Sequence, residues 1–308
     1  MSSASAPAGH LARSQNIPLG IGLMVVAIFL FSANDVLGKW LAASYAAPQI
    51  LLFRSAAAIL VLTPVIGRIG FRALVEVQRP WLQLVRAVLA TGEVALFYWS
   101  VVYLPLADAM TYYLAGPIYV TVMAAAFLRE NVGWRRWTAV LVGFFGVLIA
   151  LGPSMASFGW PVLIAFTGSV VYAVFLVITR ALRGTPDTVM AAWQIGLNLV
   201  FGIVFAPLVW VPLGAWFDGL LLAVLGVVAL TAIVFVNRSL ALAPASVVVP
   251  YQYTLIVWAV IFGYFVFGDV PSVQMLAGAA IIIAAGLYIF VREQKMGVES
   301  ELEAPPER

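Results

Sequence analysis

Residues 97–119 read FYWSVVYLPLADAMTYYLAGPIY, and residues 236–258 read VNRSLALAPASVVVPYQYTLIVW. Each stretch is the end of one hydrophobic helix, a break at proline and the start of a second hydrophobic helix. Without the breaks at Pro105 and Pro244, each pair of helices would merge into one block far longer than the roughly 20 residues that a spanning helix needs. The two stretches therefore predict two antiparallel helical hairpins.

A shift of about 139 residues lays the first hairpin on the second. The residues that coincide are Ser100 with Ser239, Pro105 with Pro244, Tyr112 with Tyr251, and Glu130 with Asp269. Identity is low, but the hydropathy and the hairpin spacing repeat well. We therefore predict one five-helix repeat over residues 17–151 and a second over residues 160–291, joined by an extracytoplasmic linker at residues 152–159. Because five helices are an odd number, the second copy must enter the membrane inverted, as in many secondary transporters.

The composition is that of a membrane protein. Of the 308 residues, 64% are hydrophobic and only 9% are charged, and the mean hydropathy is +1.07. Soluble domains carry about 25% charged residues, so a soluble fold of this composition would have no polar exterior. We expect an all-α integral membrane protein with ten transmembrane helices, at residues 17–41, 48–66, 81–103, 106–128, 134–151, 160–182, 187–210, 216–242, 245–267 and 273–291.

The basic residues predict the orientation. If the N-terminus is cytoplasmic, 14 of the 16 Lys and Arg residues fall on the inside, namely Arg13, Arg68, Arg72, Arg79, Arg86, Arg129, Arg135, Arg136, Arg180, Arg183, Arg238, Arg292, Lys295 and Arg308. The outside loops hold only Lys39, and Arg54 lies within a span. This positive-inside bias predicts a multi-pass inner (plasma) membrane protein with cytoplasmic tails at residues 1–16 and 292–308. The first apolar stretch is too long for a cleaved signal peptide.

Across residues 95–150 and 237–290 the chain resembles the drug/metabolite transporter superfamily, in its EamA-type ten-helix branch. The shared layout is a helix that ends in small residues, a proline break, a helix closed by Glu130 or Asp269, and a helix rich in Gly and Ala. The resemblance covers essentially the whole chain outside the two tails. It implies export of amino acids or other metabolites, with the aromatic amino-acid exporters as the best-fitting group.

Three charged residues are placed at membrane depth, where charges are costly and often functional. Glu93 lies near the middle of the third span, Arg54 roughly two turns inside the second, and Asp35 in the last two turns of the first. Arg54 is long enough to reach either carboxylate, so we expect an intramembrane network of the three. The network either pins helices together or serves transport, through titration of Glu93 or through contact of Arg54 with a substrate carboxylate.

Aromatic and amide side chains form a second group of candidates. A solute cavity needs an apolar wall with a few polar groups, and Tyr and Trp rings supply both. The predicted cavity residues are Tyr98, Trp99, Tyr112, Tyr113, Trp193, Gln194, Asn237, Tyr251, Tyr253 and Trp258, with Tyr172, Asn198 and Gln252 in the same constellation. The alternative is the aromatic belt at the membrane interface, which we expect for Trp40, Trp81, Trp134, Trp137, Trp160, Trp210 and Trp216.

Pro117 and Pro250 fall inside predicted helices, where proline bends or breaks the helix. We predict them as gating kinks, with static curvature of the cavity wall as the alternative. Small residues recur along residues 134–151 and 273–291 and predict close helix packing in lipid. This packing is expected within one chain, and a dimer through these spans is the alternative.

Other function classes lack their sequence signatures. The chain has one histidine, His10, no cysteine and no nucleotide-binding loop, so we expect neither an enzyme nor a cofactor nor a metal site. The basic residues are single or paired, which argues against nucleic acid. A channel needs a continuous polar path, and inverted halves fit alternating access better. We expect a secondary transporter that exports neutral or aromatic amino acids through a central cavity. The alternative is an exporter of another metabolite or drug class, or a channel-like facilitator.

Overall fold

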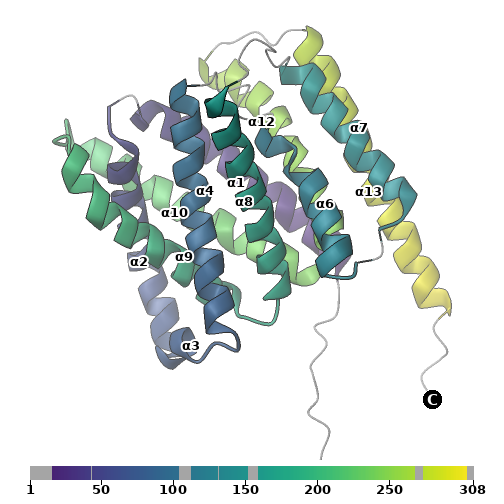
Figure 1. Ribbon diagram of the computed structural model, residues 1–308, viewed down its shortest axis with the longest axis horizontal. Coiled ribbons are helices and arrows are strands. Elements are labelled where there is room, and N and C mark those ends of the chain that lie inside the picture. Colours follow the sequence, from purple (N-terminus) through teal and green to yellow (C-terminus); the bar gives the residue numbers. More distant parts are fainter. Residues whose placement is uncertain are drawn as a thin grey trace, which may run out of the picture.

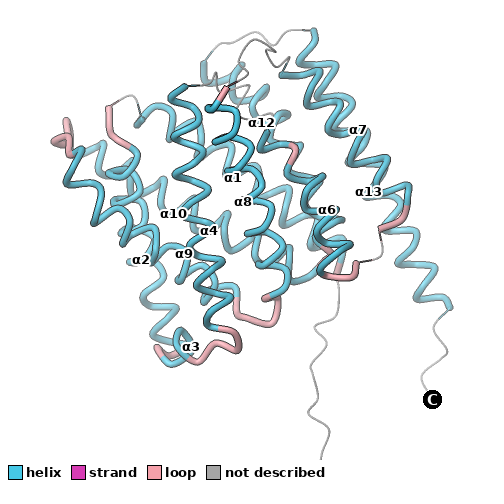
Figure 2. Tube along the Cα trace, in the orientation of Figure 1, coloured by secondary structure: helices cyan, strands magenta, loops and turns pink. Residues whose placement is uncertain are grey.

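The computed structural model describes residues 16–42, 44–103, 112–130, 132–151, 159–267 and 273–303. Within these residues every regular element is a helix and none is a strand (Figure 1 and Figure 2). A chain in lipid satisfies its backbone hydrogen bonds internally only as helices or as a closed barrel, and long apolar stretches favour helices. The prediction of an all-helical fold is confirmed for this part of the chain.

The helices follow one another with short connections. Those of the first half are α1 (Ile17–Ala42), α2 (Ala47–Ile69), α3 (Arg72–Val75), α4 (Pro80–Tyr103), α6 (Gly116–Phe127) and α7 (Trp134–Leu151). Those of the second half are α8 (Trp160–Ala181), α9 (Asp187–Phe205), η2 (Ala206–Val209), α10 (Trp216–Leu242), α11 (Ala245–Val248), η3 (Val249–Tyr253), α12 (Thr254–Phe262), η4 (Gly263–Phe267) and α13 (Val273–Glu303). α11, η3, α12 and η4 follow directly on one another and cover the predicted span 245–267.

Several described segments are long and apolar enough to cross a membrane. They are Ile17–Gly38, Ala47–Ile69, Trp160–Ala181, Asp187–Val209, Trp216–Leu242 and Ala245–Val266. Shorter apolar helices cover Tyr112–Phe127 and Val273–Ile289. The predicted break at Pro105, the residue Asp269 and most of the predicted linker 152–159 lie outside the described residues. The count of ten spans therefore stays a prediction.

Helices of the two halves pack against each other in pairs. α1 packs most extensively along α10, α4 along α8, α2 along α9, and α7 along α13. Under the shift of about 139 residues, α1 corresponds to α8 and α4 to α10, so the pair α1–α10 corresponds to the pair α8–α4. α2 corresponds to α9 and α7 to α13, so each of these two pairs corresponds to itself. This pattern of helix pairs is expected when two structurally related halves pack face to face. It places α1, α2 and α4 of one half opposite α8, α9 and α10 of the other.

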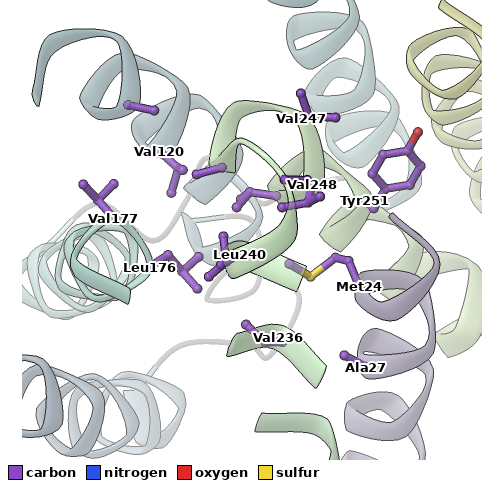
Figure 3. Close-up of a cluster of buried hydrophobic side chains, with 14 of the residues drawn as sticks. Met24, Ala27, Val120, Leu176, Val177, Val236, Leu240, Val247, Val248 and Tyr251 are labelled. Atoms are coloured by element: carbon purple, nitrogen blue, oxygen red, sulfur yellow. The ribbon is translucent and has the colours of Figure 1, made fainter. Parts of the chain in front are cut away.

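The largest apolar cluster lies where the two halves meet (Figure 3). Its fully buried side chains come from helices of both halves and include Met24 and Ala27 of α1, Val120 of α6, Leu176 of α8, Leu240 of α10, and Val247 and Val248 of α11. Lipid is as apolar as these side chains, so close van der Waals packing rather than exclusion from water holds them together. The cluster ties α11 to α1 and α6 of the other half.

Large apolar side chains also cover the outside of the bundle. Leu60 and Phe127 have exposed fractions of 74% and 75%, so lipid rather than water is the solvent that suits this surface. Most tryptophans expected at the membrane interface are exposed, namely Trp40, Trp81, Trp134, Trp160, Trp210 and Trp216. Trp137 is half-buried.

α7 and α13 approach each other through small residues. A β-carbon on Gly278 would meet the carbonyl oxygen of Gly146 at 2.5 Å, so no larger residue fits there. The small residues of these spans are thus used within the chain, and a dimer through them stays a prediction. α13 continues to Glu303, so residues 292–303 of the predicted tail extend the last helix. That stretch has no proline and is rich in helix-forming Glu, Gln, Lys and Leu.

The helices are interrupted near both predicted proline kinks. Residues 112–114 are helical, the chain turns at Ala115, and α6 starts at Gly116 with Pro117 in its first turn. Proline fits the first turn of a helix because its missing N–H has no partner there anyway. Pro250 lies in the 3-10 segment η3, between α11 and α12. A role of either proline in gating stays a prediction.

The connections that carry many of the basic residues gather at one end of the bundle. Figure 2 shows the α6–α7 and α8–α9 connections at the lower end, together with α3. The C-terminal part of α13 lies toward the same end (Figure 1). We call this end, formed by residues 70–79, 128–130, 132–133 and 182–186, the basic end. It is the end predicted to be cytoplasmic, and the orientation of the termini stays a prediction.

At the opposite end the α1–α2 turn is tied to the α9–α10 connection. The hydroxyl of Tyr45 donates a hydrogen bond to Asp218 and accepts one from the N–H of Gly214. The bond to Asp218 raises the pKa of Tyr45, because ionisation of the phenol would break it. Gln49 donates to the carbonyl oxygen of Val211 over 2.6 Å and accepts from its N–H over 3.0 Å. These bonds join the first half of the chain to the second.

Candidate functional site

Three charged side chains meet within the helical bundle. Asp35 lies on α1, Arg54 on α2 and Glu93 near the middle of α4. The guanidinium of Arg54 is close enough to both carboxylates to act on each electrostatically. The structure therefore brings together the three residues that the sequence placed at membrane depth.

These three side chains are surrounded by protein and still accessible. Asp35 is exposed, and Arg54 and Glu93 are partly exposed. Protein atoms nevertheless lie densely enough around both carboxylates to strip much of their hydration. Charged groups that protein surrounds and that keep accessible surface are suited to meet a solute.

Contacts at the same level hold α1 and α2 against α10. The side-chain amide of Asn34, next to Asp35, donates to the carbonyl oxygen of Leu225 over 2.8 Å. The following residue of α10, Gly226, lies directly against the backbone of Arg54. A β-carbon at Gly226 would collide with that backbone, so only glycine lets α10 approach α2 this closely. One turn of α10 thus positions both Asp35 and Arg54.

Two tyrosines flank Glu93. The hydroxyl of Tyr113, just before α6, donates to the carbonyl oxygen of Glu93 over 3.2 Å, and its ring packs edge-to-face on Phe97. Tyr172 of α8 is close enough to interact electrostatically with the carboxylate of Glu93. The hydroxyl oxygen of Tyr172 accepts a hydrogen bond from Nε2 of Gln252 over 2.5 Å. Its own proton is therefore directed at another acceptor.

These residues form one group, which we call the central cluster: Asp35, Arg54, Glu93, Tyr113, Tyr172 and Gln252. Four come from the first half and two from the second. The cluster offers a guanidinium for a carboxylate, two carboxylates for a cation, and aromatic faces for a ring or a cation. In the described part of the chain, no three His, Cys, Asp or Glu side chains lie together as they would to hold a metal ion.

Arg86 of α4 is a second cation inside the bundle, and sequence reasoning misplaced it. It was counted among the cytoplasmic basic residues, but its side chain is fully buried. The ring of Phe175 covers the guanidinium, with 4.9 Å between the guanidinium carbon and the ring centroid. Its hydrogen-bond acceptors are Oγ1 of Thr179 (2.7 Å), the carbonyl of Met190 (3.1 Å), Oε1 of Gln194 (3.3 Å) and Oδ1 of Asn237 (2.8 Å).

The partners of Arg86 are all neutral. Among the described residues no carboxylate lies within ion-pair distance of its guanidinium. Hydrogen bonds and the aromatic ring must therefore compensate for the lost hydration of a charged group. The acceptors lie on α8, α9 and α10, so Arg86 joins α4 of the first half to three helices of the second. Gln194 and Asn237, predicted as cavity residues, are partners of Arg86.

A positional signal for Arg86 was present in the sequence. Arg86 precedes Glu93 by seven residues, which is about two helical turns, so both lie on the same face of α4. The predicted network with Asp35 and Arg54 requires Glu93 to face the other helices, and the same face then places Arg86 inside as well. Arg86 lies between the central cluster and the basic end.

Other predicted cavity residues lie apart from the central cluster. The hydroxyl of Tyr251 donates to the carbonyl of Gly286 over 3.0 Å, and that of Tyr253 to the carbonyl of Val140 over 3.3 Å. Both tyrosines therefore face α13 and α7. The remaining residues are spread over other positions: Trp193 donates to the carbonyl of Leu74 in α3, Trp99 is exposed, Tyr112 packs beside Ala165, Trp258 packs on Phe29, and the side chain of Tyr98 lies outside the described residues.

Comparison with known proteins identifies relatives along nearly the whole chain. The model of the EamA-like transporter family matches residues 18–152 and again residues 159–291. An S-adenosylmethionine uptake transporter of Rickettsia felis is 27% identical and aligns over 90% of this chain and 94% of its own length. A riboflavin transporter of Rhizobium johnstonii is 30% identical over 88% and 91% of the two chains. A pseudopaline exporter of Pseudomonas aeruginosa is 30% identical over 86% and 94%.

A solved crystal structure shares the fold, with a TM-score of 0.74 at 16% identity over 87% of this chain and 95% of the other. The resemblance to the EamA-type branch is thus confirmed, and the relatives indicate a transporter rather than an enzyme. These three relatives are named for other metabolites, so the resemblance to aromatic amino-acid exporters stays a prediction. The chain is a multi-pass membrane transporter that belongs to the EamA-like transporter family.

Proposed function

We propose that the chain is an alternating-access secondary transporter in which a small organic metabolite binds at the central cluster, between two inverted five-helix halves. Two observations support the inverted halves. The family model matches the chain once in each half. The helix pairs exchange or map onto themselves under the shift of about 139 residues. A site between such halves can open to either face with similar energy.

The placement of one guanidinium and two carboxylates beside two tyrosine rings carries the proposal for the substrate. Arg54 suits a substrate carboxylate, and Asp35 and Glu93 suit a substrate ammonium group. Tyr113 and Tyr172 suit an aromatic or heteroaromatic ring. We therefore propose amino acids and amino-acid derivatives that carry such a ring. Aromatic amino acids belong to this class, and so does S-adenosylmethionine, the compound for which one relative is named.

The proposed location is the plasma (inner) membrane, with the basic end in the cytoplasm. The connections at that end carry Arg72, Arg79, Arg129 and Arg183, in line with the positive-inside rule. Export is the proposed direction in the cell. A carrier that is not driven by an energy source moves its substrate down the concentration gradient of that substrate. Reconstituted protein is therefore expected to transport in both directions.

Counterflow in proteoliposomes tests the proposal. Vesicles preloaded with unlabelled phenylalanine, S-adenosylmethionine or riboflavin are diluted into a trace of the same labelled compound. A carrier that exchanges substrate accumulates the label transiently, and the rate saturates with concentration. Preference for phenylalanine or S-adenosylmethionine over riboflavin would support binding at paired opposite charges.

Two outcomes would contradict the proposal in different ways. Preference for riboflavin, which has no amino-acid group, would refute the role of paired charges in choosing the substrate. Uptake that neither saturates nor shows counterflow would instead indicate a channel-like facilitator.

A further inference from the structure

Glu130, in the connection between α6 and α7, binds the start of α11 in the other half of the chain. Its Oε1 accepts a hydrogen bond from the N–H of Ala245 over 3.0 Å. Its Oε2 accepts bonds from the N–H and from the hydroxyl of Ser246, over 3.1 and 2.7 Å. The same hydroxyl accepts a bond from Arg136 at the start of α7 over 2.9 Å. Three hydrogen bonds from the α6–α7 connection and one from α7 thereby fix this part of the first half to α11.

Arg180, near the end of α8, adds a second link. Its Nε lies 3.4 Å from Oε1 of Glu130, and its Nη1 donates to the carbonyl oxygens of Leu240 and Ala241 over 2.7 and 3.3 Å. Those carbonyls belong to the last turn of α10, where backbone acceptors lack partners within the helix. Arg180 therefore connects the end of α10 to the carboxylate that holds the start of α11.

These contacts are strong because they are charged and shielded from water. The side chains of Glu130 and Arg180 are only 10% and 5% exposed. Hydrogen bonds with an ionised partner are roughly twice as strong as neutral ones, and enclosure strengthens them further. The start of α11 has no capping side chain of its own, since Pro244 precedes it. Glu130 thus supplies, from the other half, acceptors that the local sequence does not.

The apolar cluster of Figure 3 includes the two residues that directly follow Ser246. Val247 and Val248 follow Ser246 and are fully buried, and they pack with Val120 of α6 and Leu176 of α8. A polar layer and an apolar layer together join the two halves at the basic end. α11 cannot move away from α6 and α8 without breaking both.

We propose that Glu130, Arg180 and Ser246 form a latch that closes the basic end of the transporter, and that the latch opens when α11 moves away from α6 and α8 to release substrate at that end. The inference rests on the proposed alternating-access function and names the residues that control one of its two gates. In this proposal the hydrogen bonds and the ion pair described above are the contacts of the closed gate.

Single cysteines can report the gate directly, because the chain has none of its own. One reporter is Val248→Cys, behind the latch. The other is Phe97→Cys, one turn from Glu93 toward the opposite end of α4. Each is labelled with a water-soluble maleimide in nanodiscs, where both ends of the protein meet water, with and without Glu130→Gln. The neutral amide of Gln cannot replace a carboxylate that accepts three hydrogen bonds and pairs with Arg180.

Opening of the latch predicts opposite changes at the two reporters. Glu130→Gln should speed labelling of Val248→Cys by about tenfold or more, since charged hydrogen bonds each shift such an equilibrium by that order. It should slow labelling of Phe97→Cys, because opening one end closes the other. Ser246→Ala removes only the hydroxyl and should give a smaller shift in the same directions, which keeps a test available if Glu130→Gln folds poorly.

The matched control is Arg238→Gln. It removes the ion pair between Arg238 and Asp187 (3.6 Å), which lies at the same end but wholly within the second half. Labelling of both reporters should stay at the wild-type rate. Faster labelling of both reporters in Glu130→Gln, with a lower melting temperature, would show that Glu130 only stabilises the fold and would overturn the latch. Unchanged labelling would overturn it as well.

Labelling needs no substrate, so its result is independent of the counterflow experiment. Opposite shifts together with absent counterflow would retain the latch and refute the proposed substrate class. Counterflow with unchanged labelling would retain the transporter and refute the latch.

Discussion

The carbonyl oxygen of Arg54 in α2 occupies the space that a β-carbon on Gly226 of α10 would need. The two residues lie in different halves of the chain, so this contact sets the position of the Arg54 side chain relative to the second half. The neighbouring residue Leu225 holds Asn34, and through it Asp35, at the same level. A single glycine therefore controls how closely two members of the central cluster approach.

Gly226→Ala is expected to displace α2 from α10 and to abolish transport. The added methyl group meets backbone, which cannot rotate away as a flexible side chain can. Overpacking of this kind costs about 1–3 kcal/mol or more, which lowers the melting temperature by roughly 3–10 °C in a chain of this size. Thermal melts in detergent and counterflow in proteoliposomes measure the two effects.

The control for this substitution is Gly196→Ala in α9, where an added β-carbon meets nothing within 4 Å. Alanine is also favoured over glycine within a helix by about 1 kcal/mol, so this variant should be as stable as wild type or more so. Wild-type transport by Gly226→Ala would show that the close approach of α2 and α10 is not needed for function.

Arg86→Gln should destabilise the protein strongly. The shorter neutral side chain leaves Thr179, Asn237 and the carbonyl of Met190 without their donor, and hydrogen bonds to a charged group contribute about 1.5–3 kcal/mol each. A melting temperature lower by about 10 °C or more is expected. Arg79→Gln, an exposed change just before α4, should shift the melting temperature by no more than about 1–2 °C. Equal melting temperatures for the two variants would rule out a structural role for the Arg86 contacts.

The helices and the charged residues of the central cluster could be predicted from the sequence. Long apolar stretches determine where helices form in lipid, and charges such as Glu93 within them stand out against that background. Arg86 does not stand out, because basic residues near the ends of spans are normally at the membrane surface. Its burial depends on acceptors from α8, α9 and α10, more than 90 residues further along the chain. Periodicity within α4 cannot reveal partners on other helices.

The tyrosines show the same limit. Tyr251 and Tyr253 were predicted beside a cavity from their positions within a span, like Tyr113. The 3-10 segment η3 turns them toward α13 and α7, whereas Gln252 between them reaches Tyr172. A change from 3.6 to about 3 residues per turn alters which side chains face the centre. The spacing of residues in an apolar stretch does not predict where an α-helix changes to a 3-10 helix.

Tyr172→Phe is expected to weaken substrate binding while the fold stays intact. The change removes the hydroxyl that accepts from Gln252 and lies near Glu93, and it keeps the ring. A neutral hydrogen bond contributes about 0.5–1.5 kcal/mol, so the concentration for half-maximal counterflow should rise roughly two- to tenfold. Tyr251→Phe removes a hydroxyl bound to Gly286 outside the central cluster and should leave that concentration unchanged. Equal effects of the two changes would argue against a substrate contact at Tyr172.

Glu93→Gln is expected to separate exchange from proton coupling. If Glu93 carries the proton that drives net transport, the neutral isostere cannot load or release it, so an imposed pH gradient should no longer drive accumulation of substrate. Counterflow needs only exchange of substrate across the membrane and should persist in the same vesicles, with a higher concentration for half-maximal rate because the proposed site loses one of its two carboxylates. Initial rates of both processes, measured between pH 6 and 8 at roughly unit intervals, test this directly.

Asp35→Asn is the matched control, because it neutralises the other carboxylate that faces Arg54 and leaves Glu93 in place. This variant should keep a pH-driven component of transport. Loss of the pH-driven component only in Glu93→Gln would assign the proton to that carboxylate. Wild-type pH dependence in Glu93→Gln would exclude it, and the opposite charges of the central cluster would then serve substrate binding and helix packing alone.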